Sequence, residues 1–272
     1  MKLIKQNDSA GGLIFKQNNN GKAMKQNYNF GRGFNKSLTN NCYIECPFVP
    51  QITEPFTILS WNDLNPPTSD ISLQSNCFLL RDLDNGAKLS MGVRAYSGTT
   101  ILSRANVWNS GSGHSVIGSA PWSSGQKGML GVRTDGVQFQ AIRSNSYGTL
   151  QLNSSLNQSA STNLYAALSN YSGIKYESRL VLDFKVYSRK ITDEEVSYLY
   201  NNNLGNEPLS VFGLKAWYKM NNAEILEYKG NSAVCVRDYS GNGNHGFIHG
   251  LPAGTLQEQL TWANSNIFFT SL

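Results

Sequence analysis

One segment of the chain has the composition of a sugar-binding surface. Residues 105–126 contain Trp108, His114 and Trp122 among Asn, Ser and Gly, and Tyr147 follows in similar surroundings. A pyranose has an apolar face and a polar edge, so aromatic rings surrounded by amides and hydroxyls match it. The alternative is that both tryptophans belong to the core or to a subunit interface. These four residues are therefore the candidate carbohydrate-binding residues, and both interpretations stay open.

Asp82, Asp84 and Asn85 are acidic and amide residues close enough in sequence to suggest a calcium loop. They do not follow the Asp-x-Asp-x-Asp-Gly spacing of such loops. Asn85-Gly86 instead favours a two-residue hairpin turn, because both residues of such a turn need a positive φ, which Asn and Gly adopt readily. We expect no cofactor here, although a single calcium ion is left open.

Cys42, Cys46, His245 and His249 resemble a four-ligand zinc set by type alone. On extended strands the members of each pair would lie about 13 Å apart. Zinc bonds are only about 2.0–2.3 Å long, so the two members of a pair could not share one ion. We expect no metal, and the four irregularly spaced cysteines are predicted to be free and buried.

The net charge of +5 is concentrated near the N-terminus, because residues 1–40 carry +6 and the remainder carries −1. The tripeptide Lys-Gln-Asn occurs three times in this arm, twice after apolar residues, which is either compositional bias or a set of repeated anchors. An acidic protein surface is the favoured partner over nucleic acid, because dense Arg runs are absent. The predicted anchoring residues are Lys5, Phe15, Lys16, Lys25 and Arg32.

No secretion signal or membrane span is expected. The first six residues begin like a signal peptide, but Asn7 and Asp8 precede any apolar run. No stretch approaches the roughly 20 apolar residues of a membrane helix. We expect a protein that is made in a cytoplasm and stays there or leaves inside a particle.

The composition and the alternating patterns predict mainly strands. Charged residues are only 15% of the chain, while aromatics are 11% and can fill a core. Alternating patterns predict hairpins over 77–93 and 129–142, turning at Asn85-Gly86 and Asp135-Gly136. Further strands are predicted at 56–61, 164–168, 179–187, 213–220 and 233–238.

One short helix is predicted after residue 191. Thr192 and Glu195 have the spacing of a capping box, and Ile191 and Val196 that of a hydrophobic staple. Asp193 and Glu194 then occupy the first turn, where the helix dipole favours acidic residues.

Three segments carry motifs in addition to their strand patterns. They are Phe56-Thr57-Ile58-Leu59-Ser60-Trp61, the strand and helix start from Phe184 to Val196, and Gly213–Met220 followed by Asp238-Tyr239-Ser240-Gly241-Asn242-Gly243-Asn244-His245-Gly246. They resemble the FTI strand, the closing strand and helix, and the opening block of the laminin-G and concanavalin A-like lectin/glucanase superfamily. The resemblance covers roughly residues 48–250, weakly in the middle.

The order of these motifs departs from that superfamily, because the opening block here follows the closing helix. A circular permutation is the favoured explanation, since chain ends in such folds often lie close together. Otherwise residues 208–272 begin a second unit that pairs with a neighbouring chain, which would force oligomerisation.

Catalysis is not expected. Glucanases of this superfamily carry closely spaced Glu and Asp side chains as nucleophile and acid. The chain contains no Glu-x-Asp-x-x-Glu, and its dense acidic cluster, residues 193–195, is explained by the helix start. The resemblance therefore implies binding rather than turnover.

The fold class expected is all-β, an antiparallel jelly-roll sandwich with one short helix and an extended N-terminal arm. Residues 1–45 would form the arm and 46–272 the lectin-like domain, which 208–272 would complete. The Asn-rich composition and permuted motifs resemble virion proteins of phages infecting gut Bacteroidetes, including crAss-like phages.

That resemblance implies a non-enzymatic virion protein, a head fibre or capsid decoration, or else a tail-associated protein. The arm would bind a capsid or other virion protein, and the domain would form a homotrimer or homodimer and touch host glycans. Neither nucleic acid nor a membrane is an expected partner. The alternative is a secreted or surface carbohydrate-binding module or glycoside hydrolase.

Overall fold

The structure is a computed structural model. It describes residues 33–35, 43–51, 53–64, 74–82, 86–97, 100–109, 112–117, 126–143, 146–151, 162–166, 179–201, 207–266 and 268–269, with side chains for 44–51, 53–61, 129–142, 181–200, 207–266 and 268. The predicted anchoring residues Lys5, Phe15, Lys16, Lys25 and Arg32, and also Trp122, lie outside the described residues.

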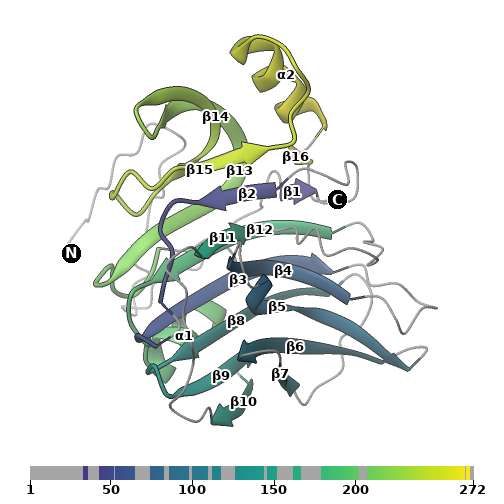
Figure 1. Ribbon diagram of the computed structural model, residues 1–272, viewed down its shortest axis with the longest axis vertical. Helices are drawn as coiled ribbons and strands as arrows, with labels where there is room; N and C mark the ends of the chain where they lie inside the picture. The colour runs from purple at the N-terminus through teal and green to yellow at the C-terminus, as the bar shows by residue number, and fades with distance from the viewer. Residues whose placement is uncertain are drawn as a thin grey trace, which may run out of the picture.

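Strands make up most of the described chain (Figure 1). They are β1 (Gly33–Asn35), β2 (Tyr43–Cys46), β3 (Phe56–Leu64), β4 (Gln74–Asp82), β5 (Gly86–Ser97), β6 (Thr100–Asn109), β7 (Ser112–Ile117), β8 (Gln126–Thr134), β9 (Gln138–Arg143), β10 (Ser146–Gln151), β11 (Thr162–Ala166), β12 (Arg179–Tyr187), β13 (Leu214–Tyr228), β14 (Asn231–Asp238), β15 (Gly246–His249) and β16 (Phe268–Phe269). The helices described are α1 (Asp193–Asn201) and α2 (Leu256–Asn266).

The strands form one antiparallel path that folds back on itself. Its order is β10-β9-β8-β3-β12-β13-β14-β15-β2-β11-β4-β5-β6-β7, and outside this path β1 pairs with β12 and β16 pairs with β1. The long strand β13 shifts register between Tyr218 and Ala223, where Met220 has a φ of 52°. The two ends of the path, β7 and β10, approach each other. The fold is therefore an all-β antiparallel sandwich, which confirms the predicted fold class.

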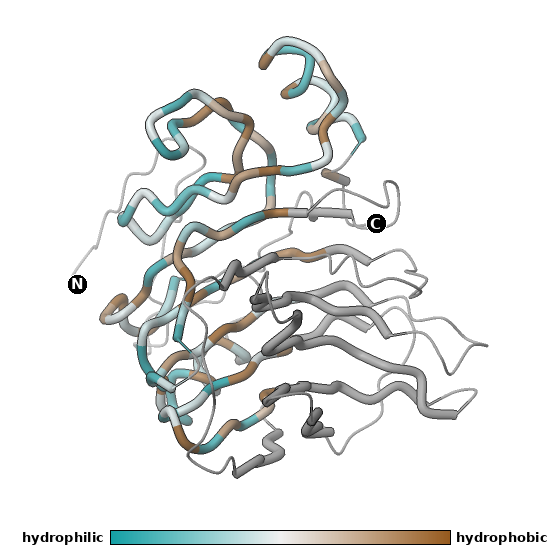
Figure 2. The backbone as a smooth tube through the Cα atoms, viewed as in Figure 1, coloured by the Kyte–Doolittle hydropathy of each residue, from teal (hydrophilic) through white to brown (hydrophobic). Residues whose placement is uncertain are grey.

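The core fills the space between the two layers. Hydrophobic and hydrophilic residues are interspersed along the coloured strands of Figure 2. On the strands whose side chains are described, one face is buried, and Ile58, Val132, Phe184, Tyr218 and Ile248 pack into a single cluster. This burial of alternating residues is what holds the two layers together.

The opposite face of β3, β12 and β13 is covered by α1. Trp61, Tyr187 and Trp217 from the strands pack with Val196 and Leu199 of the helix in a second buried cluster. Helix α1 therefore closes a sheet face that would otherwise be exposed. Helix α2 lies at the end of the molecule opposite to β7 and β10 (Figure 1).

The strand pairs of both predicted hairpins are present. β4 pairs with β5, and β8 pairs with β9 across Asp135-Gly136. In the second turn Gly136 has a φ of 93°, and the Asp135 carboxylate accepts hydrogen bonds from the amides of Val137 and Gln138. These local contacts fix the register between β8 and β9.

Gly136→Ala is expected to lower the free energy of unfolding by about 2 kcal/mol. An added Cβ would combine the strain of a positive φ with a contact of 2.3 Å to the Thr53 carbonyl oxygen. Gly230→Ala is the matched control, because Gly230 has a φ of 80° but no atom within 4 Å of its Cβ position. It should cost only about 1 kcal/mol. Urea unfolding measures both, and equal losses would contradict the steric explanation.

The predicted capping box of α1 is confirmed, and a second helix accompanies it. The Glu195 amide donates to the Thr192 hydroxyl and the Thr192 amide to the Glu195 carboxylate. Helix α2 begins with the same device at Thr255 and Glu258. Only one helix was expected from the sequence, because α2 has a weak apolar face in which Ala263 is the buried residue.

The sheet begins inside the range assigned to the arm. β1 pairs with β12 and β16, and β2 lies between β15 and β11, with Ile44 fully buried. Cys46 and Cys235, the cysteines with described side chains, are buried and free. Neither described helix is long and apolar enough to cross a membrane.

Candidate functional site

The predicted carbohydrate-binding residues fall on three strands, apart from Trp122. Trp108 lies on β6, His114 on β7 and Tyr147 on β10. Trp108 is paired with Gly113, whereas His114 is paired with Val107, so positions 108 and 114 are on alternate faces of the ribbon. Tyr147 is paired with Ile142 at the other end of the strand path. The register therefore does not bring the three positions onto one face, and their role in binding stays a prediction.

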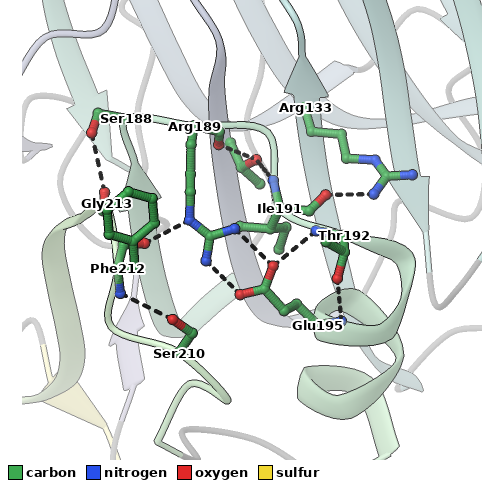
Figure 3. Close-up of polar contacts among 10 residues, drawn as sticks. Arg133, Ser188, Arg189, Ile191, Thr192, Glu195, Ser210, Phe212 and Gly213 are labelled. Carbon is green, nitrogen blue, oxygen red and sulfur yellow. Dashed lines mark hydrogen bonds and ion pairs between the residues drawn. The ribbon is translucent and has the colours of Figure 1, made fainter.

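Arg189, within the strand-and-helix motif from Phe184 to Val196, connects α1, β3 and the segment before β13 (Figure 3). The Arg189 guanidinium donates to the Phe212 carbonyl oxygen at 2.6 Å and forms a two-pronged ion pair with Glu195. Thr57 on β3 donates its hydroxyl to the Arg189 carbonyl and accepts from the Ile191 amide. This network ties α1 to the sheet and to the segment before β13, so its role is structural.

The Gly- and Asn-rich loop after β14 is also held internally. The Asp238 carboxylate accepts hydrogen bonds from the amides of Trp217, Ser240 and Asn244. His245 Nδ1 accepts from the Asp238 amide at 3.1 Å, so this histidine stabilises the loop. The loop is thus a folded connection whose polar groups bind one another.

A buried ion pair lies on the α1-covered face. Asp183 and Lys185 are both 2% exposed and are bonded to each other, and Asp183 also accepts from the Trp217 Nε1 at 2.7 Å. Burial lowers the pKa of Lys185, while Asp183 opposes this change. Burial beneath α1, at 2% exposure of both residues, keeps the pair away from solvent and from a ligand outside the protein.

A more accessible polar cluster lies where β2, β13 and β15 meet. We call it the Glu45 cluster, and it consists of Glu45, Tyr228, Lys229, Phe247 and His249. The Glu45 carboxylate receives His249 Nε2 at 2.7 Å on Oε2, and Tyr228 Oη at 2.8 Å and Lys229 Nζ at 3.1 Å on Oε1. The Glu45 side chain is 15% exposed, that of His249 29% and that of Lys229 64%. The cluster therefore borders solvent.

Aromatic rings form the second part of the Glu45 cluster. The rings of Tyr228 and Phe247 stack with centroids 5.0 Å apart, and His249 meets Phe247 edge-on at 4.4 Å. Phe247 is the register partner of Glu45, and Glu45 is the register partner of Tyr165 on β11. Paired residues share a face, so position 165 lies beside Glu45 on the side opposite Phe247. The outer face of the sheet thus carries a carboxylate between two aromatic positions.

The donors around Glu45 lower the pKa of its carboxyl to about 2, and the hydrogen bond from His249 is the largest cause. The raised pKa of Tyr228, about 12, arises from burial and keeps its hydroxyl protonated as a donor. Glu45 is therefore an anion over the whole physiological pH range and only accepts hydrogen bonds.

The lowered pKa predicts acid-sensitive stability. Since the folded pKa of about 2 is below the ordinary value of 4.5, the contribution of Glu45 is full above about pH 4.5 and is lost as the pH falls toward 2. Glu45→Gln should remove this part of the slope when the free energy of unfolding is followed from pH 6 to pH 2. An unchanged slope in the variant would contradict the assignment.

Few features of the sequence indicate the Glu45 cluster. Phe247 and His249 show the two-residue spacing of one strand face, but Glu45 lies 204 positions from His249. Only strand pairing brings them together. The described residues contain no group of three or more His, Cys, Asp and Glu that could hold a metal ion.

The layers and the strand order define an all-β antiparallel sandwich. No family model and no curated protein sequence matches the chain. Among solved structures it is similar to a provisionally assigned carbohydrate-binding protein from Bacteroides ovatus ATCC 8483, with a TM-score of 0.54 and 12% identity over 84% of this chain and 61% of that one.

It is also similar to the full-length tailspike protein 2 of the Escherichia coli O157:H7 bacteriophage CAB120, with a TM-score of 0.52 and 10% identity. That match covers 70% of this chain and 26% of the tailspike. The chain thus spans about three fifths of the first protein and about a quarter of the second. At these identities the similarities establish the fold alone.

Proposed function

We propose that this protein binds carbohydrate without transforming it, as a structural component of a phage particle. The observation that carries the proposal is the Glu45 cluster, a half-buried carboxylate beside stacked rings on the outer face of a lectin-like sandwich. Aromatic faces next to preorganised polar groups suit the two surfaces of a sugar. The neighbouring folds, one assigned to carbohydrate binding and one to a phage tailspike, support the same proposal.

The carboxyl groups support a binding role rather than hydrolysis. A glycosidase needs a general acid with a raised pKa beside a second carboxylate. Wherever a carboxyl pKa is shifted in the described residues, it is lowered, as for Glu45, Asp135, Glu195 and Glu258. The described carboxyls therefore favour charge pairing and hydrogen bonding over proton donation.

Within a particle, the basic N-terminal arm would attach the protein to a capsid or other virion component, as a head fibre or decoration. Its +6 charge over residues 1–40 suits an acidic protein surface. Attachment through the arm should weaken as salt is raised, because exposed charges are screened. Multiple copies, as a trimer or dimer, would raise avidity for repeated surface glycans.

The test is a glycan array probed with the full chain. The proposal predicts binding to a defined set of glycans that is competed by the free sugar. The glycans that bind should then survive prolonged incubation with the protein, with no reducing ends released. Turnover of any of them would instead support the glycoside hydrolase alternative, and no binding to any glycan would defeat both.

A further inference from the structure

We infer that the Glu45 cluster selects uncharged glycans, with the Glu45 carboxylate accepting a sugar hydroxyl. This inference rests on the proposed carbohydrate-binding function and assigns that function a site and a ligand class. It follows from the number of open acceptor positions, from the charge of the cluster and from its aromatic neighbours.

The first step is the acceptor capacity of the carboxylate. Each carboxylate oxygen can accept about two hydrogen bonds. Oε1 already accepts from Tyr228 and Lys229, whereas Oε2 accepts from His249. Among the residues whose side chains the structure describes, no second donor reaches Oε2, so one acceptor position there is open. Since Glu45 is ionised, a ligand must bring a donor to that position, and a sugar hydroxyl is such a group.

The second step is the charge around that open position. The Lys229 ammonium binds Oε1, the other oxygen, whereas Oε2 contacts His249 Nε2, whose ring is charged only when protonated. An ionised acid on a ligand would face the negative Oε2 directly and would be repelled. A neutral hydroxyl would gain a charge-assisted hydrogen bond instead. The site thus disfavours uronic, sialic and sulfated sugars.

The third step is the aromatic surface next to the carboxylate. Phe247 lies on the neighbouring strand, about 4.8 Å away at the backbone, and position 165 is one strand away on the other side. Tyr228 stacks on Phe247 and also donates to Glu45, so ring and carboxylate are fixed relative to each other. This arrangement matches a pyranose that places its apolar face on a ring and a hydroxyl on the carboxylate.

The experiment compares the full chain with two single variants on an array of neutral, uronic, sialylated and sulfated glycans. Glu45→Gln removes the charge with little change in shape, and Glu227→Gln is the control because Glu227 is an exposed carboxylate on the same strand as Tyr228. We expect the wild type and Glu227→Gln to bind neutral glycans equally. Glu45→Gln should bind them about tenfold more weakly, which corresponds to one charge-assisted hydrogen bond.

A third variant separates binding from folding. Tyr228→Phe keeps the ring stack but removes a donor to Glu45, so it should weaken the binding of neutral glycans by several-fold while thermal unfolding shows an intact fold. Binding that is restricted to acidic glycans, or neutral binding that Glu45→Gln leaves unchanged, would overturn the inference while leaving carbohydrate binding in place. Failure of the wild type to bind any glycan would overturn the proposed function itself.

Discussion

Replacing Lys185 with Met is expected to lower the free energy of unfolding by about 3–5 kcal/mol, which is a large part of the stability of a typical domain. The change leaves Asp183 as an unpaired charge at a site where the residue is 2% exposed. Asp183→Asn should cost a similar amount, because Lys185 is then buried without a counter-ion. Urea unfolding followed by tryptophan fluorescence measures both losses.

The double variant Asp183→Asn/Lys185→Met is the decisive control. The new amide oxygen at position 183 can still accept from Trp217 Nε1, which lies 2.7 Å from Asp183 in the wild type, and neither position 183 nor position 185 then carries a charge. We expect it to be within about 2 kcal/mol of the wild type and more stable than either single variant. A double variant that loses the sum of the two single losses would show that the charges do not stabilise each other.

Arg189→Ala is expected to cost about 3 kcal/mol, because it releases two elements at once. It leaves the Glu195 carboxylate, which is 10% exposed, without its ion-pair partner and the Phe212 carbonyl without its donor (Figure 3). Arg189→Lys keeps the charge but loses the planar fork, so it should recover only part of the loss. Urea unfolding gives the global effect.

Protease sensitivity gives the local effect of the same change. Phe212 is 76% exposed and is held by its contact with Arg189, so Arg189→Ala should speed chymotrypsin cleavage after Phe212. Lys190→Ala is the matched control, since Lys190 forms an exposed ion pair with Asp135 that is worth at most about 1 kcal/mol. Equal effects of the two variants would contradict the central role of Arg189.

Local patterns predicted the fold well where the signal lay within a few residues. The Asp135-Gly136 turn and the Thr192–Glu195 capping box depend on backbone preferences and on neighbours in sequence, so the residue pattern alone is enough to predict them. The Thr255–Glu258 box has the same pattern, but α2 lacks a strong apolar face to accompany it. A cap without amphipathicity is a weak signal for a helix.

Alternation is misleading where the strand is irregular. In β12, strict alternation predicts that residues 181, 183, 185 and 187 share one face, but the register shifts between Val181 and Asp183. Val181 therefore joins the central cluster, whereas Leu182 joins the cluster under α1. One extra residue in a strand reverses the faces that follow, and sequence periodicity does not reveal it.

The candidate site depends on contacts that no local pattern encodes. Glu45, Tyr228 and His249 come from β2, β13 and β15, of which β2 and β15 pair directly, while β14 lies between β15 and β13 in the sheet. Sugar-like composition in the sequence lies around Trp108 and His114, whereas the carboxylate and ring cluster with described side chains lies on β2, β13 and β15. Glu45 is more than 180 residues from Tyr228 and His249 in the sequence, so only the strand order could reveal the cluster.

We expect this sandwich to hold a glycan and to leave it intact. The most direct measurement incubates the full chain with a polysaccharide that it binds, and follows the bound fraction and the release of reducing ends in one experiment. We expect saturable binding with no release over hours. Release that a single carboxylate substitution abolishes would identify an enzyme and contradict the claim.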